Sequence, residues 1–158
     1  MNREKEKKNG GKGLAGGGLA IGALHEINPV FMRQGDDDTE CLSIEIVVGN
    51  RQIRCVAGYG PQLGDSIERK ESFWRFLDEE TKSAQESDVG IIIQMDSNAW
   101  AGPDIIPSDP NKQNANGKLM EKFLKENPAL IVVNSLKCCE RSITRQRTSI
   151  LGEKKTLN

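Results

Sequence analysis

Two side chains suited to acid–base chemistry follow an apolar run near the middle of the chain. Val89 and Ile91–Ile93 lead into Gln94-Met95-Asp96-Ser97-Asn98. Alternate residues of an extended segment point the same way, so Asp96 and Asn98 are expected to face one cleft beyond a strand's end. A carboxylate can take a proton or orient water, and an amide can donate to a phosphate or a developing oxyanion. Asp and Asn are also ordinary turn formers, so a simple strand-to-turn interpretation stays open for this stretch.

Three other groups of residues could carry chemistry, but their contexts do not favour it. Gly11–Gly16 fits G-x-G-x-x-G by letter, yet no predicted strand precedes it and no helix pattern follows, so no nucleotide cofactor is expected. His25, the single histidine, has no motif-level partner and is interpreted as a surface or packing residue. Asp36–Asp38 lack the spacing and glycine of a calcium loop.

Composition narrows the class of protein. The chain has 158 residues, 28% of them charged and 4% aromatic, which is typical of a soluble globular domain. It has no signal peptide and no apolar run long enough to span a membrane, so an intracellular protein of the nucleus or cytoplasm is expected. The four cysteines include no C-x-x-C pair, which favours free thiols over zinc or disulfides.

Charge is segregated along the chain, although the net charge is only −1. Met1–Lys12 holds five basic residues against two acidic ones, and Lys137–Asn158 holds six against two. The middle is therefore acidic, and a uniformly basic nucleic-acid face is absent. Either end could meet phosphates, or it could be a solvated tail.

Periodicity predicts the elements that must position these residues. A β-hairpin is predicted by two segments of alternating apolar and polar residues, Leu42–Val48 and Ile53–Tyr59, on either side of the turn Gly49-Asn50. Pro61 ends the second strand just after Tyr59. An apolar stripe predicts a helix over 65–83, with Asp65 and Glu68 at capping-box spacing. A Pro- and Asn-rich loop over 99–116 leads to a second helix, capped by Asn116 and ended by Asn127-Pro128.

Three more segments are expected to be strands: Gly16–Leu24, Leu130–Asn134 and Arg141–Leu151, the last with Arg145 and Arg147 on one face. Val89–Gln94 and Leu130–Asn134 are continuous apolar runs, so they are predicted to lie side by side in one sheet, each buried on both faces. Strands outnumber helices, which favours a sheet-on-sheet core with helices outside. Residues 1–13 are expected to form a flexible basic lead-in and residues 14–158 one domain.

These motifs together resemble the endonuclease/exonuclease/phosphatase superfamily, and most closely the endonuclease domain of non-LTR-type retroelements. The residues that carry the resemblance are, in chain order, Gly16–Ile21, Val56–Pro61, Gln94–Ala99, Asn116-Gly117, Leu130–Ser135 and Thr144 with Arg145 and Arg147. Met95 stands where the family has glycine in its Gly-Asp-x-Asn-Ala motif. Several motifs in the right order are more specific than any one of them.

The resemblance implies an α/β (α+β) fold, a partial αββα sandwich of two β-sheets with outer helices. It implies a Mg²⁺- or Mn²⁺-dependent DNA endonuclease that hydrolyses phosphodiesters, with Tyr59 on the scissile phosphate. Asp96 would hold or deprotonate the attacking water, and Asn98 would orient Asp96 and stabilise extra negative charge. Thr144, Arg145 and Arg147 would contact DNA, the expected partner of the complete domain.

Departures from the family pattern leave two other functions open. The family's first metal ligand is a Glu on a strand before the glycine-led strand, and Glu4 and Glu6 lack that setting, so the metal ligands are unknown. The chain is therefore expected to be an internal fragment that is inactive, or nearly so, by itself. The alternatives are a non-catalytic scaffold or binding module derived from such a domain, and a phosphatase of the same superfamily.

Overall fold

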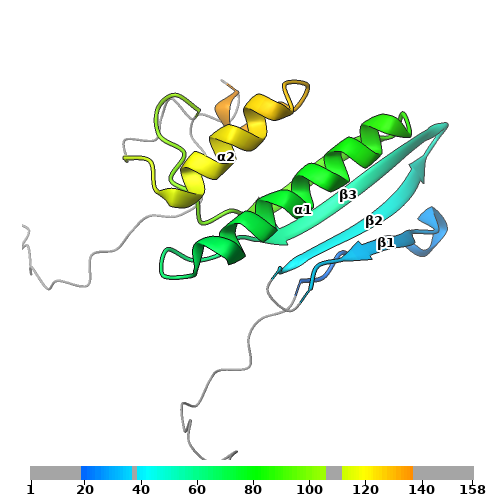
Figure 1. Ribbon diagram of the computed structural model, residues 1–158. Helices are drawn as coiled ribbons and strands as arrows, with labels where there is room; N and C mark the ends of the chain where they lie inside the picture. The colour runs from blue at the N-terminus through cyan, green and yellow to red at the C-terminus, as the bar shows by residue number, and fades with distance from the viewer. Residues whose placement is uncertain (1–18, 37–38, 106–111, 137–158) are drawn as a thin grey trace, which may run out of the picture. The chain divides into compact units, whose positions relative to one another are not determined.

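A computed structural model of the chain describes residues 19–36, 39–105 and 112–136 (Figure 1). The chain divides into two compact units, Met1–Ala99 and Trp100–Asn158. Among the described residues, the first unit contains a short 3-10 helix, η1 (His25–Ile27), four strands and helix α1. The second contains helix α2 and the 3-10 helix η2. None of the described helices combines the length and apolarity needed to cross a membrane.

The four strands form one mixed sheet in the order β1-β2-β3-β4. Strand β2 (Cys41–Val48) pairs antiparallel with β1 (Val30–Gln34) on one side and with β3 (Arg51–Tyr59) on the other. Strand β4 (Gly90–Asp96) pairs parallel with β3. The predicted hairpin is confirmed as β2 and β3. Its turn places Gly49 at φ 62°, in the left-handed region that glycine adopts without steric cost.

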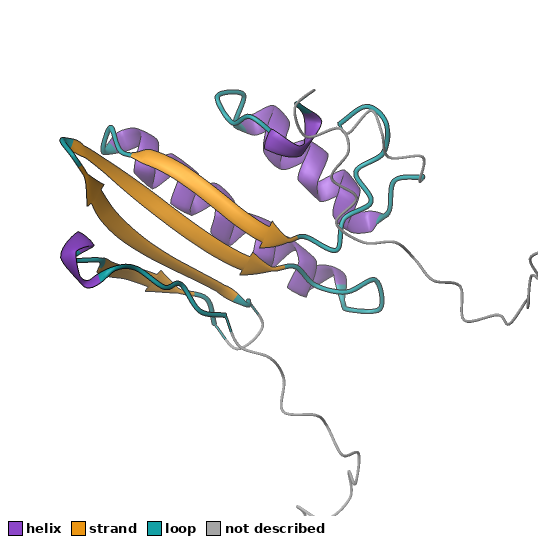
Figure 2. Cartoon of the chain, turned by 180° about the vertical axis from the view of Figure 1, so that it is seen from behind, coloured by secondary structure: helices purple, strands orange, loops and turns teal. Residues whose placement is uncertain are grey.

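Helix α1 (Ile67–Glu86) packs on one face of this sheet and provides most of the core of the first unit (Figure 2). Its buried side chains include Phe73, Trp74, Phe76 and Leu77, the apolar stripe that the sequence predicts. A Cβ at Gly58 of β3 would lie 3.2 Å from the Phe73 ring, so glycine lets the helix approach the strand closely. The helix begins after Ser66, whose side chain accepts the Arg69 amide, rather than after Asp65.

Helix α2 (Ala115–Glu126) follows the long loop of the second unit. It begins two residues earlier than predicted, because Asn114 rather than Asn116 caps it. Asn114 Oδ1 accepts the Gly117 amide at 2.7 Å and the Trp100 amide at 3.1 Å, which ties the loop to the helix start. Asn116 is instead buried.

The α+β class is confirmed by the mixed sheet and two helices, but several predicted strands are corrected. The run Val89–Gln94 does form a strand, β4, yet this strand lies at the edge of the described sheet and its residues are alternately exposed and half-buried. The run Leu130–Asn134 is not a strand, because Val133–Ser135 turns into η2 and the residues before it are irregular. The prediction that these two runs pair, each buried on both faces, is therefore wrong.

The N-terminal part of the sheet also differs from the sequence prediction. Leu19–Leu24, the described part of the predicted strand Gly16–Leu24, contains no strand, and β1 follows at Val30–Gln34 instead. All five β1 residues are exposed. The strand therefore has no buried face, and its sequence lacks the alternation of polar and apolar residues from which a strand is predicted. The predicted strand Arg141–Leu151 and the lead-in over 1–13 lie outside the described residues. Within the described residues there is a single sheet, so the sandwich of two sheets stays a prediction.

Candidate functional site at the carboxyl ends of β3 and β4

The parallel pairing of β3 and β4 brings Tyr59 and Asp96 together. They are the last partners in the register, with Gly58 opposite Met95 just before them. Neighbouring strands lie about 4.8 Å apart, and paired residues of parallel strands point to the same face of a sheet. The phenol and the carboxylate therefore leave the sheet side by side, on the face opposite the one that carries Gly58 and α1.

Asn98 is held at the same end of the sheet by two hydrogen bonds. Its backbone N–H donates to Asp96 Oδ1 at 3.2 Å, and its side-chain Nδ2 donates to the Gly60 carbonyl at 2.7 Å. Asn98 has a φ of 47°, a left-handed conformation that asparagine adopts more readily than most residues. The amide side chain thus bridges from the segment after β4 to the segment after β3.

Gly60 makes this close approach possible, and pattern reasoning from the sequence did not single it out. Its N–H donates to the Asp96 carbonyl at 2.6 Å, which extends the pairing by one residue beyond Tyr59. A Cβ at this position would lie 2.6 Å from the carbonyl carbon of Ser97 and 2.9 Å from its Cα. Real Cβ atoms are not found at such distances from backbone, so a larger residue here would separate the two chain segments.

The site is open to solvent. The Tyr59 residue is 37% exposed, Asp96 is exposed, and Asn98 is half-buried. An exposed carboxylate beside a phenol and an oriented amide can bind water, accept a proton or form hydrogen bonds to a charged oxygen. The structure thus brings all three predicted catalytic residues together at one end of the sheet. The predicted DNA contacts Thr144, Arg145 and Arg147 lie outside the described residues.

The donor set in this part of the chain does not fit a divalent metal ion. Among the described residues, no group of three or more His, Cys, Asp or Glu side chains could hold one. Glu40 lies at the same end of the sheet, since its carbonyl accepts the Tyr59 amide at 2.9 Å. Its carboxylate, however, pairs with Arg69 of α1 at 3.2 Å, on the other face of the sheet. Asp96 is therefore the one carboxylate that accompanies Tyr59 and Asn98 in the described geometry.

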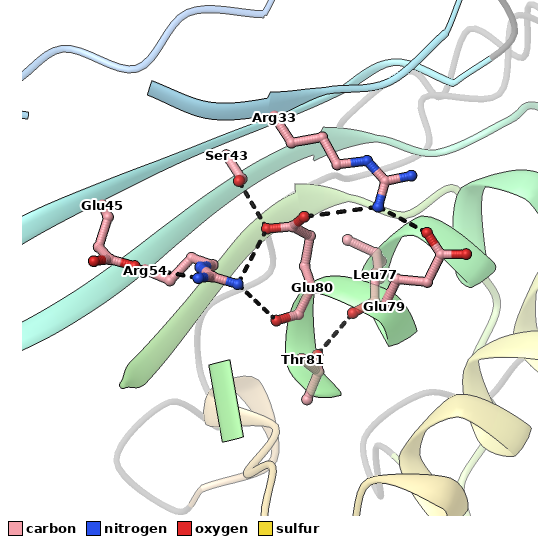
Figure 3. Close-up of polar contacts among 8 residues, drawn as sticks. All are labelled: Arg33, Ser43, Glu45, Arg54, Leu77, Glu79, Glu80 and Thr81. Carbon is pink, nitrogen blue, oxygen red and sulfur yellow. Dashed lines mark hydrogen bonds and ion pairs between the residues drawn. The ribbon is translucent and has the colours of Figure 1, made fainter. Parts of the chain in front are cut away.

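A second polar cluster, which sequence periodicity does not reveal, lies between the sheet and α1 (Figure 3). Glu80 is 5% exposed and accepts the Ser43 hydroxyl at 2.8 Å. Arg54, 4% exposed, lies 3.7 Å from the Glu80 carboxylate and 3.2 Å from that of Glu45. Arg33 extends the cluster toward solvent by pairing with Glu79 at 2.7 Å. These contacts join β1, β2 and β3 to one turn of α1, so the cluster has a structural explanation.

Burial also explains why the described cysteines are poor nucleophiles. Burial, reinforced by the nearby negative charge of Glu80, raises the pKa of Cys41 from 9.0 to about 12. Burial likewise raises the pKa of Cys55. A protonated thiol is a weak nucleophile and a weak metal ligand, so these two residues are packing groups, in agreement with the expected free thiols.

No protein-family model, curated protein or solved structure matches this chain. Its function therefore has to be inferred from the residues and their geometry.

Proposed function

We propose that the end of the sheet carrying Tyr59, Asp96 and Asn98 is part of a phosphodiesterase site that acts on DNA. The observation that supports this proposal is the parallel register, which sets Tyr59 opposite Asp96 while Asn98 donates to Asp96 and to Gly60. The proposal also rests on the resemblance of the motifs to endonuclease domains of retroelements, within the endonuclease/exonuclease/phosphatase superfamily.

Each of the three side chains has a role that its chemistry allows. The Tyr59 hydroxyl donates a hydrogen bond to a non-bridging oxygen of the scissile phosphate. The Asp96 carboxylate orients the attacking water and accepts its proton. The Asn98 amide, fixed by the Gly60 carbonyl, is a hydrogen-bond donor of the kind that stabilises the negative charge developing on the phosphate.

A Mg²⁺ or Mn²⁺ ion belongs to the proposal through the resemblance alone. The described residues provide one suitable carboxylate, Asp96, and this is too few ligands for a divalent ion that prefers octahedral oxygen coordination. Further ligands would have to come from residues outside the described ranges or from a longer protein that contains this chain.

A second candidate function is a non-catalytic scaffold or binding module derived from the same type of domain. The observation that favours it is that Asp96 is the one carboxylate beside Tyr59 and Asn98 in the part of the chain that the structure describes, because a site that acts as a unit loses most of its activity when partners are missing. A phosphatase of the same superfamily is a third possibility, which the choice of substrate would distinguish.

Plasmid nicking in the presence of Mg²⁺ or Mn²⁺ tests the proposal. We expect little or no nicking by the 158-residue chain, and metal-dependent nicking by a longer protein that supplies further metal ligands, such as the family's Glu on a preceding strand. In that longer protein Asp96→Asn should lower the rate by about 10²- to 10⁴-fold, the usual contribution of a positioned acid–base group. Asp88→Asn is the matched control, because Asp88 is an exposed aspartate at the opposite end of β4 with φ 54°, which asparagine tolerates.

Four outcomes separate the candidates. An active longer protein that is indifferent to Asp96→Asn would refute the site. DNA binding without nicking in every form would favour the scaffold, and release of phosphate from a monoester but not from plasmid DNA would favour the phosphatase. Robust metal-dependent nicking by the 158-residue chain itself would refute the expectation that it is an inactive fragment.

A further inference from the structure

The outer edge of β4 lacks the features that keep edge strands from pairing with other chains. Among the described residues β4 pairs with β3 alone, so the backbone groups on its other side have no strand partner there. Gly90–Met95 contains no charged residue and no proline. Ile92 is 50% exposed in the middle of the strand. Natural sheets usually protect such an edge with lysine, proline, a bulge or a very short strand.

We propose that this edge pairs with the same edge of a second copy of the chain. The pairing is antiparallel about a two-fold axis perpendicular to the sheet, and it joins two four-stranded sheets into one of eight strands. Such an interface is isologous and closed, so association stops at the dimer. The proposal is independent of the proposed phosphodiesterase function.

The sequence of β4 favours one register for this pairing. In an antiparallel pair, opposite residues share a face of the sheet. An odd-numbered residue of β4 in one copy must therefore lie opposite an odd-numbered residue of β4 in the other, and an even-numbered residue opposite an even-numbered one. If the two-fold axis passes between the Ile93 residues of the two copies, each Ile93 lies opposite the other. Ile91 of one copy then lies opposite Met95 of the second copy. The half-buried side chains of the α1 face then form one continuous apolar row.

Charge disfavours the neighbouring registers. With the axis at Ile93, each Asp96 lies opposite Gly90, so the two carboxylates are at opposite ends of the pairing. Moving the axis to Ile92 would set Asp88 of one copy opposite Asp96 of the other, and directly opposed like charges destabilise a sheet. Moving it to Gln94 would set Ile91 opposite Ser97, which breaks the apolar row.

Disulfide trapping tests both the partner and the register. In the Ile93-centred dimer, Ile92 lies opposite Gln94 of the second copy, with Cα atoms about 4.5–5.5 Å apart, within the range a disulfide can bridge. In a background where the four native cysteines are alanine, an equimolar mixture of Ile92→Cys and Gln94→Cys copies should form a crosslinked heterodimer. Either variant alone should crosslink much less, because identical positions are offset by two residues.

Charge reversal provides a second test that does not depend on cysteine. A copy with Ile92→Lys and Gln94→Lys should associate about tenfold more weakly or worse in sedimentation velocity, since lysines would face each other twice across the interface. A copy with Ile92→Glu and Gln94→Glu should behave likewise, and mixing the two should restore the dimer. Val47→Lys is the matched control, because Val47 is 53% exposed on β2, away from the edge.

The possible outcomes are distinct. A parent chain that remains monomeric at every concentration would overturn the proposal, whether another segment or another protein occupies the edge. Assemblies that grow beyond the dimer would overturn the closed two-fold arrangement. Crosslinking of Ile92→Cys or Gln94→Cys with itself, in preference to the mixture, would overturn the register. Circular dichroism of each variant confirms that loss of association is not loss of folding.

Discussion

Replacing Gly60 by alanine should separate the ends of β3 and β4 and so disturb the candidate site without touching its side chains. The new Cβ would lie 2.6 Å from the Ser97 carbonyl carbon and 2.9 Å from Ser97 Cα. These are backbone atoms, so a side-chain rotation cannot relieve the overlap and the two segments must move apart. That movement weakens the Gly60–Asp96 and Asn98–Gly60 hydrogen bonds, now 2.6 and 2.7 Å long.

The cost can be estimated from two contributions. Overpacking of this kind costs about 1–3 kcal/mol. Hydrogen bonds contribute about 0.5–1.5 kcal/mol each, and here two of them are strained. Because the two hydrogen bonds are weakened rather than lost, Gly60→Ala should lower the free energy of unfolding by about 2–4 kcal/mol. With a urea dependence of about 2 kcal/mol per molar, the unfolding midpoint should fall by about 1–2 M.

Gly64→Ala is the control for Gly60→Ala, because a Cβ at Gly64 would meet nothing within 4 Å. This substitution should leave stability unchanged or raise it by about 0.4–1 kcal/mol, through the lower conformational entropy of the unfolded chain. Urea unfolding followed by circular dichroism at 222 nm reports the loss of α1 and α2 in both variants. Equal midpoints for the two variants would refute the close approach of Gly60 to Ser97 on which the site geometry depends.

Three further predictions concern the core and the second unit. Glu80→Leu should lower stability by about 1.5–3 kcal/mol in urea unfolding, because buried Arg54 loses one of its two carboxylate partners and keeps Glu45. Glu79→Leu, at a side chain 45% exposed, should cost less than about 1 kcal/mol, and equal effects would argue against the buried pair. Folding raises the pKa of Cys41 to about 12, so the folded chain should bind more protons than the unfolded chain from about pH 9 to 12. The free energy of unfolding should therefore be unaffected by this thiol below pH 9 and should fall as the pH rises through that window. A Cys41→Ala chain should show a flatter decline in urea unfolding over the same range. Asn114→Ala removes the N-cap of α2 and should destabilise this helix by about 0.5–2 kcal/mol. The loss should appear as faster amide hydrogen exchange in α2, and unchanged exchange would mean that the cap contributes little.

The sequence by itself determined the elements whose patterns are local. Alternation around Gly49-Asn50 specified the β2–β3 hairpin, and the apolar stripe that includes Phe73 and Leu77 specified α1. In both cases neighbouring residues share one buried face, so periodicity reports the burial directly. The spacing of Asp96 and Asn98 predicts that both face one cleft through the alternation of an extended segment, but Asn98 adopts a left-handed conformation instead, and its backbone N–H bonds the Asp96 carboxylate.

Tertiary structure alone decided which elements meet. The apolar runs Val89–Gln94 and Leu130–Asn134 look alike in sequence, yet one becomes an edge strand and the other does not pair, because a strand exists only where another strand satisfies its backbone. The polar cluster of Arg54 and Glu80 could not be predicted from the sequence either. Charged residues are normally expected to be exposed, and only the pairing of these two permits their burial. The neighbourhood of Tyr59 and Asp96 depends on a parallel register between distant segments, which no local pattern encodes.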